Sequence, residues 1–153
     1  MHITEIFRIE DIIEDLKAKT KRGVLAELSE IFTLGPNKVD SKLMVDVLME
    51  REKLGSTGIG DGIAIPHGKL KGMDTLLLSF GRSREGIDFE SIDSKPVHLF
   101  FLLMAPESST GQHLKALAKI SRMLKDERFR SELMSARSAE GLFKAIAEKD
   151  ETY

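Results

Sequence analysis

Hydrophobic residues recur at intervals of three and four along much of this chain, and this spacing predicts amphipathic helices. Residues so spaced lie on one face of a helix, where they can pack against a core. The first helix is expected to begin near Thr20 and the second after Asp40 or Ser41, since short polar side chains cap helix N-termini. The buried faces are predicted to comprise Val24, Leu25, Leu28, Ile31 and Phe32 in the first helix and Met44, Val47 and Leu48 in the second.

The C-terminal part of the chain repeats this pattern. Ser108, Ser109 and Thr110 are candidate N-caps for a third helix. Two further helical stretches follow, the last of them with Ser138 as its expected cap. The inward positions are predicted to be His113, Leu117, Ile120 and Leu124, then Phe129 and Leu133, then Leu142, Phe143 and Ile146.

Other apolar runs are continuous rather than periodic, which is typical of buried strands. These runs are Ile63-Ala64-Ile65, Thr75–Phe80 and Val97–Met104. Gly81–Gly86 is interpreted as a charged turn, with extended structure resuming at Ile87–Phe89.

The N-terminal part of the chain leaves one element open. Residues Ile12–Ala18 fit either a helical stripe or a short strand. Gly35-Pro36-Asn37 carries turn chemistry that would end the first helix. Helices and strands thus alternate, with neighbouring strands between Thr75 and Met104, and this order predicts an α/β fold in which helices cover both faces of a mixed sheet.

Composition narrows the class of protein. The 153 residues suit a single domain spanning 1–153, and 41% are hydrophobic. The net charge of −2 gives no reason to expect nucleic-acid or membrane affinity. There are no cysteines, no leader-like apolar segment and no long apolar span, so we expect a cytoplasmic protein. The basic run Lys17, Lys19, Lys21 and Arg22 is either a solvated face or a site for an acidic partner.

Candidate chemistry is concentrated in the segment Leu54–Leu70, which reads LGSTGIGDGIAIPHGKL. Its five glycines allow tight turns and close approach to the backbone. The segment matches neither the P-loop nor the dinucleotide-binding glycine motif. It places His67 between a proline and a glycine, just after a short strand and on a predicted turn. Such a histidine is either a surface residue or, since neutral imidazole is a nucleophile, a site of covalent catalysis.

Two more side chains have a structural and a functional interpretation. Arg51 falls in the last turns of the second helix, where it either compensates the helix dipole or binds an anion near the glycine loop. His113 falls in the first turn of the third helix, where it either bonds to local backbone or meets an anion at the positive end of the dipole.

The sequence from Arg51 to Gly68, REKLGSTGIGDGIAIPHG, resembles the active-site signature of enzyme IIA domains of the bacterial sugar phosphotransferase system. The resemblance is closest to the fructose/mannitol type, in particular its nitrogen-regulatory group, and extends more weakly over about 140 residues. It implies one enzyme IIA (type 2) domain with a three-layer α-β-α sandwich. It also favours a strand at Ile12–Ala18. Asp61 stands where related sequences often carry asparagine, and we expect its carboxylate to face solvent.

The resemblance also implies roles for single residues. His67 would accept a phosphoryl group from an HPr-like phosphocarrier protein, at Nε2, while a backbone carbonyl holds Nδ1. His113 would be the second active-site histidine, and Arg51 would stabilise the phosphoryl group. The expected phosphoryl-binding groups are Ser56, Thr57, Gly58, Gly60 and Gly68. No cofactor or metal is expected, and an apolar patch including Ile59 and Ile63 would dock the carrier.

Three functions are consistent with these residues. The chain as given, from Met1 to Tyr153, has no fused enzyme IIB or membrane domain, which favours a phosphotransferase with a regulatory role exerted through phosphorylation-dependent partner binding. The first alternative is a sugar-uptake enzyme IIA that passes the phosphoryl group to an enzyme IIB. The second is a metal hydrolase using His67, His113 and Asp61, for which no specific ligand spacing is present.

Overall fold

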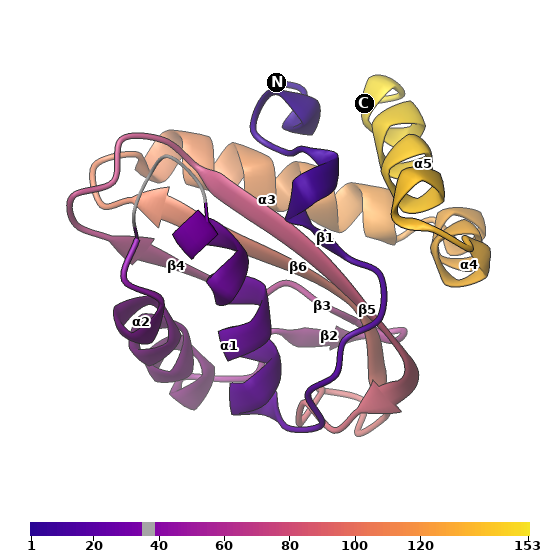
Figure 1. Cartoon of the computed structure of the whole chain (residues 1–153), viewed down its shortest axis with the longest axis horizontal. Helices are drawn as coiled ribbons and strands as arrows, with labels where there is room; N and C mark the ends of the chain where they lie inside the picture. The colour runs from indigo at the N-terminus through magenta and orange to yellow at the C-terminus, as the bar shows by residue number, and fades with distance from the viewer. Residues whose placement is uncertain (35–38) are drawn as a thin grey trace.

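The computed structural model describes residues 1–34 and 39–153. Within these residues six strands form one mixed sheet in the order β1-β5-β6-β3-β2, with β4 also paired to β6 (Figure 1). The strands are β1 (Ile12–Ile13), β2 (Gly58–Gly60), β3 (Ile63–Ala64), β4 (His67–Leu70), β5 (Leu77–Ile87) and β6 (Val97–Pro106). The helices are α1 (Lys21–Glu30), α2 (Ser41–Lys53), α3 (Thr110–Leu124), α4 (Glu127–Ser135) and α5 (Ala139–Glu151). Single helical turns lie at Ile3–Glu5, Ile9–Asp11 and Ile31–Leu34.

Strand β6 is the centre of the sheet. It pairs antiparallel with β5 on one edge and parallel with both β3 and β4 on the other. Successive side chains of a strand point to opposite faces, and the side chains from Leu99 to Met104 are all buried. The continuous apolar run therefore forms a strand covered on both sides, as predicted.

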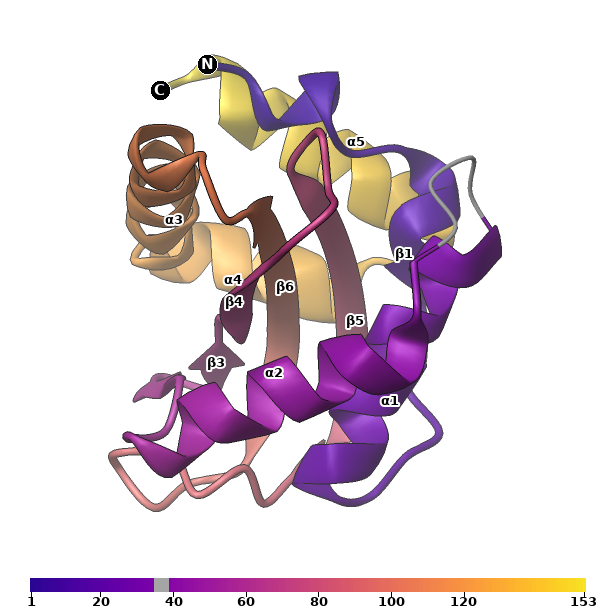
Figure 2. The ribbon, with the colours of Figure 1, turned by 90° about the vertical axis from the view of Figure 1, so that its left-hand side faces the viewer.

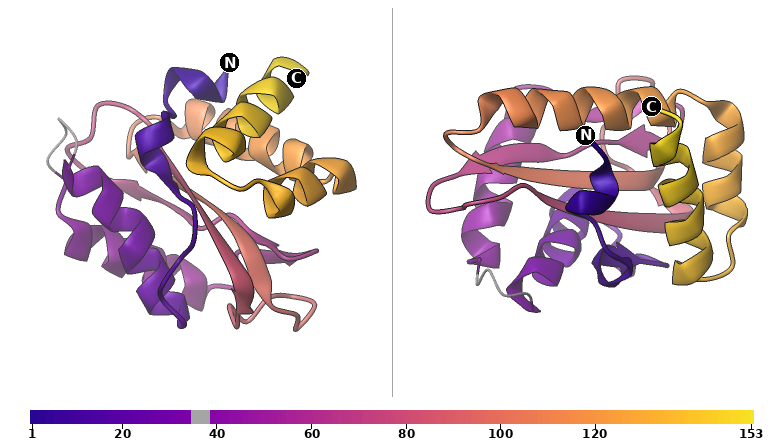
Figure 3. Two further views of the ribbon diagram at one scale, coloured as in Figure 1. Left: turned by 45° about the vertical axis from the view of Figure 1, so that its right-hand side comes forward. Right: turned by 90° about the horizontal axis from the view of Figure 1, so that it is seen from above.

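Helices cover the two faces of the sheet, so the predicted three-layer α-β-α arrangement is confirmed (Figures 2 and 3). One core joins the sheet to the C-terminal helices and the N-terminal segment, and the other joins it to α1 and α2. The first core includes Phe7, Phe80, Leu99, Phe101, Leu103, Ile120, Phe129 and Leu142. The second includes Leu25, Leu28, Phe32, Met44, Leu48, Phe100, Leu102 and Met104.

The helix starts agree with the capping residues in the sequence. Thr20, Asp40 and Ser138 each accept a backbone N–H of the first turn of α1, α2 and α5, respectively. Ser109 precedes α3 but its side chain makes no such bond. The predicted turn at Gly35-Pro36-Asn37 lies outside the described residues. No helix in the described residues is both long and apolar enough to cross a membrane.

The predicted charged turn at Gly81–Gly86 is wrong, because β5 continues through it to Ile87. Arg82 is fully buried there. Its guanidinium donates from Nε and Nη1 to the carbonyl oxygens of Glu14, Leu133 and Ala136, and these bonds offset part of the cost of burying the charge. These acceptors are far away in the sequence, so local patterning does not reveal them.

The predicted strand at Ile12–Ala18 is only partly realised. Parallel pairing with β5 is limited to Ile12 and Ile13, which lie beside Phe80 and Gly81. The backbone N–H of Leu16 donates to the Arg82 carbonyl oxygen, so the segment still follows β5 beyond the end of β1.

Candidate active site

His67 is the first residue of β4 rather than part of a turn, so that prediction is corrected. It pairs with Leu103 of β6, and Leu103 N–H also donates to the Pro66 carbonyl oxygen at 2.9 Å. The cause is a long-range pairing to β6, which the local Pro-His-Gly sequence does not encode. The side chain of His67 is half-buried, and its backbone is held in the sheet by the pairing of β4 with β6.

The ring of His67 has a defined tautomer. Nδ1 lies 2.7 Å from the carbonyl oxygen of Ile65, which only accepts hydrogen bonds. Nδ1 therefore carries the proton, and Nε2 carries the lone pair. Burial lowers the pKa of His67 most, the bond to Ile65 raises it, and the charge of Arg51 lowers it; the net shift is downward. The ring is thus neutral and nucleophilic near neutral pH.

His113 lies beside His67, as the sequence predicts for two active-site histidines. The ring centroids are 5.5 Å apart and the planes meet at 69°. His113 is 6% exposed, and its Nε2 has no hydrogen-bond partner in the part of the chain that the structure describes. Burial, the neighbouring His67 and Lys69 all lower the pKa of His113. A buried polar nitrogen without a partner is unfavourable unless a ligand or water completes it.

Arg51 extends from the last turn of α2 to the glycine loop. Its Nη1 donates to the Gly55 carbonyl oxygen at 2.9 Å. A guanidinium has five N–H donors, so this bond leaves others for an anion. Arg51 therefore lies at a helix C-terminus, as predicted, and its charge also acts on His67; binding of an anion by Arg51 stays a prediction.

The hydroxyl groups of the glycine loop are committed inside the protein. Ser56 Oγ donates to the Phe89 carbonyl oxygen at 3.0 Å and accepts from Gly58 N–H at 3.0 Å. The hydroxyl of Thr57, which is 3% exposed, donates to the carboxylate of Glu52. These bonds shape the loop and occupy the donors predicted for a phosphoryl group.

The other predicted glycines lie at different distances from His67. Gly60 pairs with Ile63 at the level of Leu99, four residues from Leu103 along β6, or about 13 Å at the rise of a strand. Gly68 follows His67 directly, and a Cβ there would lie 2.9 Å from Val47 Cγ1. Glycine at position 68 therefore allows α2 to pack closely on β4.

Two charged residues near the site were not predicted from the sequence. Lys69, also on β4, donates from Nζ to Thr110 Oγ1 at 2.9 Å and is close enough to lower the pKa of His113. Its period-two relation to His67 along a strand is a signal that would have found it. Glu52 accepts hydrogen bonds from Thr57, and its only signal in the sequence is its place next to Arg51.

Asp61 is exposed, as expected, and its backbone N–H donates to Asp93 at 3.2 Å. Among the described residues, no group of three or more His, Asp or Glu side chains could hold a metal ion. The set His67, His113 and Asp61 is therefore not assembled as metal ligands.

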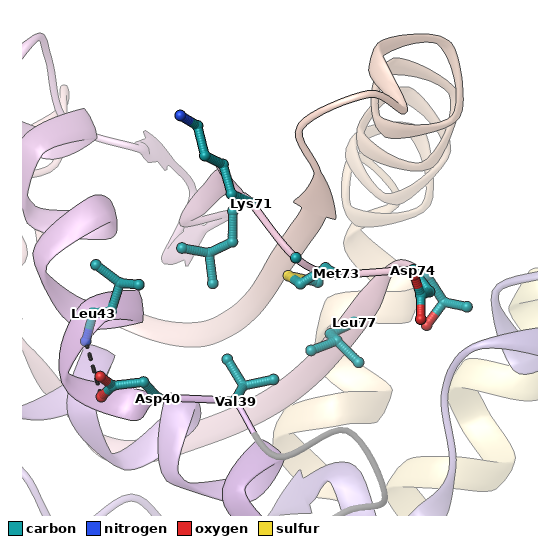
Figure 4. A pocket seen from close by; sticks show the side chains of 10 residues that line it. Val39, Asp40, Leu43, Lys71, Met73, Asp74 and Leu77 are labelled. Atoms are coloured by element: carbon teal, nitrogen blue, oxygen red, sulfur yellow. Dashed lines mark hydrogen bonds between the residues drawn. The ribbon is translucent and has the colours of Figure 1, made fainter.

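A separate pocket of about 190 Å³ lies between the start of α2 and the connection from β4 to β5 (Figure 4). None of the predicted site residues lines it. It is bounded by Val39, Asp40, Leu43, Leu70, Lys71, Gly72, Met73, Asp74, Thr75 and Leu77.

Comparison with known proteins decides the family. The model of the phosphoenolpyruvate-dependent sugar phosphotransferase system family "EIIA 2" matches residues 5–149. The chain belongs to this EIIA type 2 family. Members of the phosphotransferase system's EIIA families are phosphotransfer proteins, which establishes a general phosphotransferase role.

The EIIA relatives include nitrogen regulatory proteins and a fructose-specific component of the phosphotransferase system. The chain is 41% identical to a nitrogen regulatory protein of Bradyrhizobium diazoefficiens, over 96% of this chain and 95% of that protein. It is 35% identical to the fructose-specific EIIABC component of Bacillus subtilis, over 98% of this chain but only 24% of that protein. The crystal structure of nitrogen regulatory protein IIA-Ntr from Neisseria meningitidis superposes with a TM-score of 0.87 at 35% identity, covering 94% of this chain and 98% of that one.

A mannitol-system structure shares the fold at lower identity. Enzyme IIA-Mtl of Escherichia coli, in its complex with phosphorylated enzyme IIB-Mtl, superposes with a TM-score of 0.76 at 22% identity. It covers 93% of this chain and 97% of that one.

Proposed function

We propose that this EIIA protein is a phosphocarrier in which His67 Nε2 accepts a phosphoryl group from the phosphohistidine of an HPr-like protein. The observation that carries the proposal is the 2.7 Å bond from Nδ1 to the Ile65 carbonyl oxygen, which leaves the lone pair on Nε2. In the step, the P–N bond of the donor breaks and its electron pair returns to the donor imidazole. A new P–N bond forms at His67 Nε2, while Nδ1 keeps its proton and donates it in the hydrogen bond to the Ile65 carbonyl oxygen.

The charges around His67 favour a dianionic group. Phosphoryl transfer spreads negative charge over three equatorial oxygens, and catalysis depends on positioned donors. In our proposal the free N–H groups of Arg51 and the unpartnered Nε2 of His113 bind these oxygens, with Lys69 adding positive charge. Ser56, Thr57, Gly58 and Gly68 then shape the site, and Gly60 lies too far along the sheet to contact the phosphoryl group.

A docking surface for the carrier requires exposed apolar residues near the site. Ile63 is 3% exposed and cannot serve, which corrects that part of the prediction. Ile59 is 41% exposed, and Ile92 lies beside it because the Ile92 N–H donates to the Gly58 carbonyl oxygen. Leu54 and Leu114 are also exposed and flank Arg51 and His113 in the sequence. We therefore assign carrier docking to Leu54, Ile59, Ile92 and Leu114.

The downstream role that we favour is regulatory. It is supported by the nitrogen regulatory relatives, which match over almost their whole length. In this role the phosphorylation state of His67 changes affinity for a regulated protein. The alternative is transfer to an enzyme IIB, supported by the fructose-specific relative and the mannitol complex. Capture of partners by phosphorylated and unphosphorylated protein separates the two roles: an enzyme IIB supports transport, and a phosphorylation-sensitive partner of another class supports regulation.

The phosphocarrier proposal is tested by incubation with phosphoenolpyruvate, enzyme I and an HPr-like carrier, followed by intact mass measurement. We expect the mass of one phosphoryl group to be added to the wild-type protein and to Lys53→Met, and not to His67→Ala. No addition to wild type with cognate carriers, or addition to a folded His67→Ala protein, would overturn the proposal.

A further inference from the structure

One lysine of the basic run at the start of α1 (Lys17, Lys19, Lys21 and Arg22) differs from its neighbours. Lys19 and Arg22 form exposed ion pairs, with Glu85 at 2.7 Å and Asp46 at 3.4 Å. The side chain of Lys21 is only 13% exposed, and its Nζ lies 3.1 Å from Glu52 Oε1. The run is thus mainly a solvated face, from which Lys21 alone in this group turns inward.

The partner of Lys21 is a buried carboxylate below the glycine loop. The side chain of Glu52 is 3% exposed. Besides Lys21, it accepts the hydroxyl of Thr57 and, at 3.2 Å, the Thr57 backbone N–H. A buried carboxylate with a cationic partner and two further hydrogen bonds is a stable anchor. Lys21 is itself held on a second side, since Nζ lies 3.4 Å from Glu90 Oε1 and 4.8 Å from the centre of the Phe89 ring.

Hydrogen bonds continue from this anchor to the reactive ring. The Ile65 backbone N–H donates to the Thr57 carbonyl oxygen at 3.1 Å. The Ile65 carbonyl oxygen in turn accepts His67 Nδ1–H at 2.7 Å. The order Lys21, Glu52, Thr57, Ile65, His67 is therefore an unbroken series of polar contacts from the first residue of α1 to the imidazole.

We propose that Glu52 and Lys21 are positioning residues for His67. They hold Thr57, and through it the Ile65 carbonyl oxygen, so that His67 keeps its proton on Nδ1 and its lone pair on Nε2. Lys21 has a second effect, because it neutralises a carboxylate close to the place where the phosphoryl group arrives. The inference rests on the proposed function in one respect, namely that Nε2 is the accepting atom.

The electrostatics around His67 agree with this arrangement. Burial is the largest influence and lowers the pKa of His67; the Ile65 bond raises it, Arg51 lowers it and Glu52 raises it. His113, whose own pKa is lowered by burial, His67 and Lys69, faces the ring from α3. Arg51 and Glu52 thus act on the pKa of His67 in opposite directions from consecutive positions of α2.

The first test measures the tautomer directly in the unphosphorylated protein. Long-range ¹H–¹⁵N spectra of the imidazoles distinguish Nδ1–H from Nε2–H. We expect wild type and the matched control Glu50→Gln, an exposed residue of the same helix, to show only Nδ1–H at His67. We expect Thr57→Val and Glu52→Gln to show a mixture of tautomers, because both variants lose part of the support of Ile65.

The second test measures the rate of phosphoryl acceptance from the carrier at a fixed, subsaturating concentration. Glu52→Gln and Lys21→Met should each slow acceptance about 10-fold, the change that 1.4 kcal/mol in a barrier produces. Lys19→Met, the matched control for Lys21, should stay within about twofold of wild type. The double variant Lys21→Met/Glu52→Gln should be about as slow as one single variant, because residues that act as a unit are not additive.

The outcomes separate this inference from the proposed function. If wild type accepts no phosphoryl group, the proposed function fails, and the tautomer spectra still test the positioning of His67. If wild type accepts the group, while folded Glu52→Gln and Thr57→Val keep a pure Nδ1–H tautomer and the wild-type rate, the positioning role is overturned. Amide spectra establish whether each variant is folded, and Thr57→Val leaves both charges in place should Lys21→Met unfold.

Discussion

Two buried lysine–carboxylate pairs lie at different places in this protein, and they differ in what they connect. Lys21 and Glu52 join α1 to the glycine loop below His67. Lys119 and Asp150 join α3 to α5, with Nζ 2.5 Å from Asp150 Oδ1 and 2.5 Å from the Met1 carbonyl oxygen. The same chemistry thus leads towards the His67 ring in one region and holds the two termini together in the other, where Figure 1 shows them side by side.

The second pair is a clamp on the N-terminal segment. Asp150 is fully buried and accepts the backbone N–H of Ile3 at 3.0 Å and of Thr4 at 3.2 Å. Burial acts to raise the pKa of Asp150, but Lys119, Ile3 and Thr4 outweigh it and lower the pKa. Within residues 1–34 and 39–153, no hydrogen bond of this cluster leads to His67, although Lys119 is on the helix that carries His113. Burial and pairing are alike in the two regions, so the positioning role proposed for Lys21 and Glu52 depends on the contacts that lead on to Ile65 and His67.

The largest expected effect breaks the terminal clamp. Lys119→Met leaves Asp150 charged and buried, which costs about 3–5 kcal/mol in free energy of unfolding. Urea unfolding followed by circular dichroism measures the loss. Phosphoryl acceptance per folded molecule should remain at the wild-type rate. A transfer defect larger than the loss of folded protein would show that the two regions are coupled and would break the comparison.

The next effect concerns the other end of α3. His113→Ala removes the side chain that we propose as a donor to the phosphoryl group, and it should reduce the rate of acceptance about 100-fold, as loss of one donor to a developing charge does. Rapid quench-flow with the phosphorylated carrier measures this rate. His113→Gln retains an N–H donor and should recover part of the rate. Equal rates for the alanine and glutamine variants would contradict a hydrogen-bonding role.

A smaller effect is a shift in the pH profile of acceptance. The pKa of His67 is lowered, so the rate of phosphoryl acceptance by the wild type should fall only at pH values below about 6.5, the ordinary pKa of histidine. Arg51→Met removes a positive charge that lowers this pKa, and the acid limb should move to higher pH. Lys53→Met is the control, since Lys53 is an exposed residue of the same helical turn and pairs with Glu50. An unchanged limb in Arg51→Met would place Arg51 outside the electrostatic environment of His67.

The smallest expected effect is on the pH dependence of the free energy of unfolding, which differs between the two regions. The folded protein holds His67 and His113 with lowered pKa values, so below about pH 6.5 the unfolded chain binds more protons and the free energy of unfolding decreases. The contribution of Asp150 is fully present above its ordinary pKa of 3.8 and is lost only as pH falls further. Between pH 7 and pH 5, the free energy of unfolding measured in urea should therefore fall with decreasing pH. The slope of this fall should be smaller in His67→Ala/His113→Gln and unchanged in Asp150→Asn. If Asp150→Asn reduced this slope and the double histidine variant left it unchanged, the assignment of the pH dependence to the two histidines would be wrong.

The helices of the fold were predictable because their information is local. Thr20, Asp40 and Ser138 cap helices where the sequence places them, and the stripe from His113 to Leu124 lies inward apart from a half-buried Leu117. The strands of the sheet were less predictable from local sequence. For example, the buried Arg82 in β5 donates to a carbonyl oxygen more than 50 residues away. Pairing with Leu103 likewise makes His67 a strand residue.

The site was predictable as far as its residues lie in one motif or on one helix face. The structure brings His67, His113 and Arg51 together, but no local pattern indicates that Ser56 and Thr57 donate their hydroxyls internally. The contact from Lys21 to Glu52 joins two helices and depends on tertiary packing. Local patterns therefore indicate the candidate site residues, and long-range contacts determine how they are held.

The most direct test of the central claim is the identity of the phosphorylated nitrogen. Heteronuclear NMR of the ¹⁵N-histidine-labelled protein, phosphorylated through its carrier, detects the coupling between phosphorus and one ring nitrogen. We predict a single coupling, at His67 Nε2, with the proton still on Nδ1 opposite Ile65. Phosphorus on Nδ1 of His67, or on His113, would contradict the account.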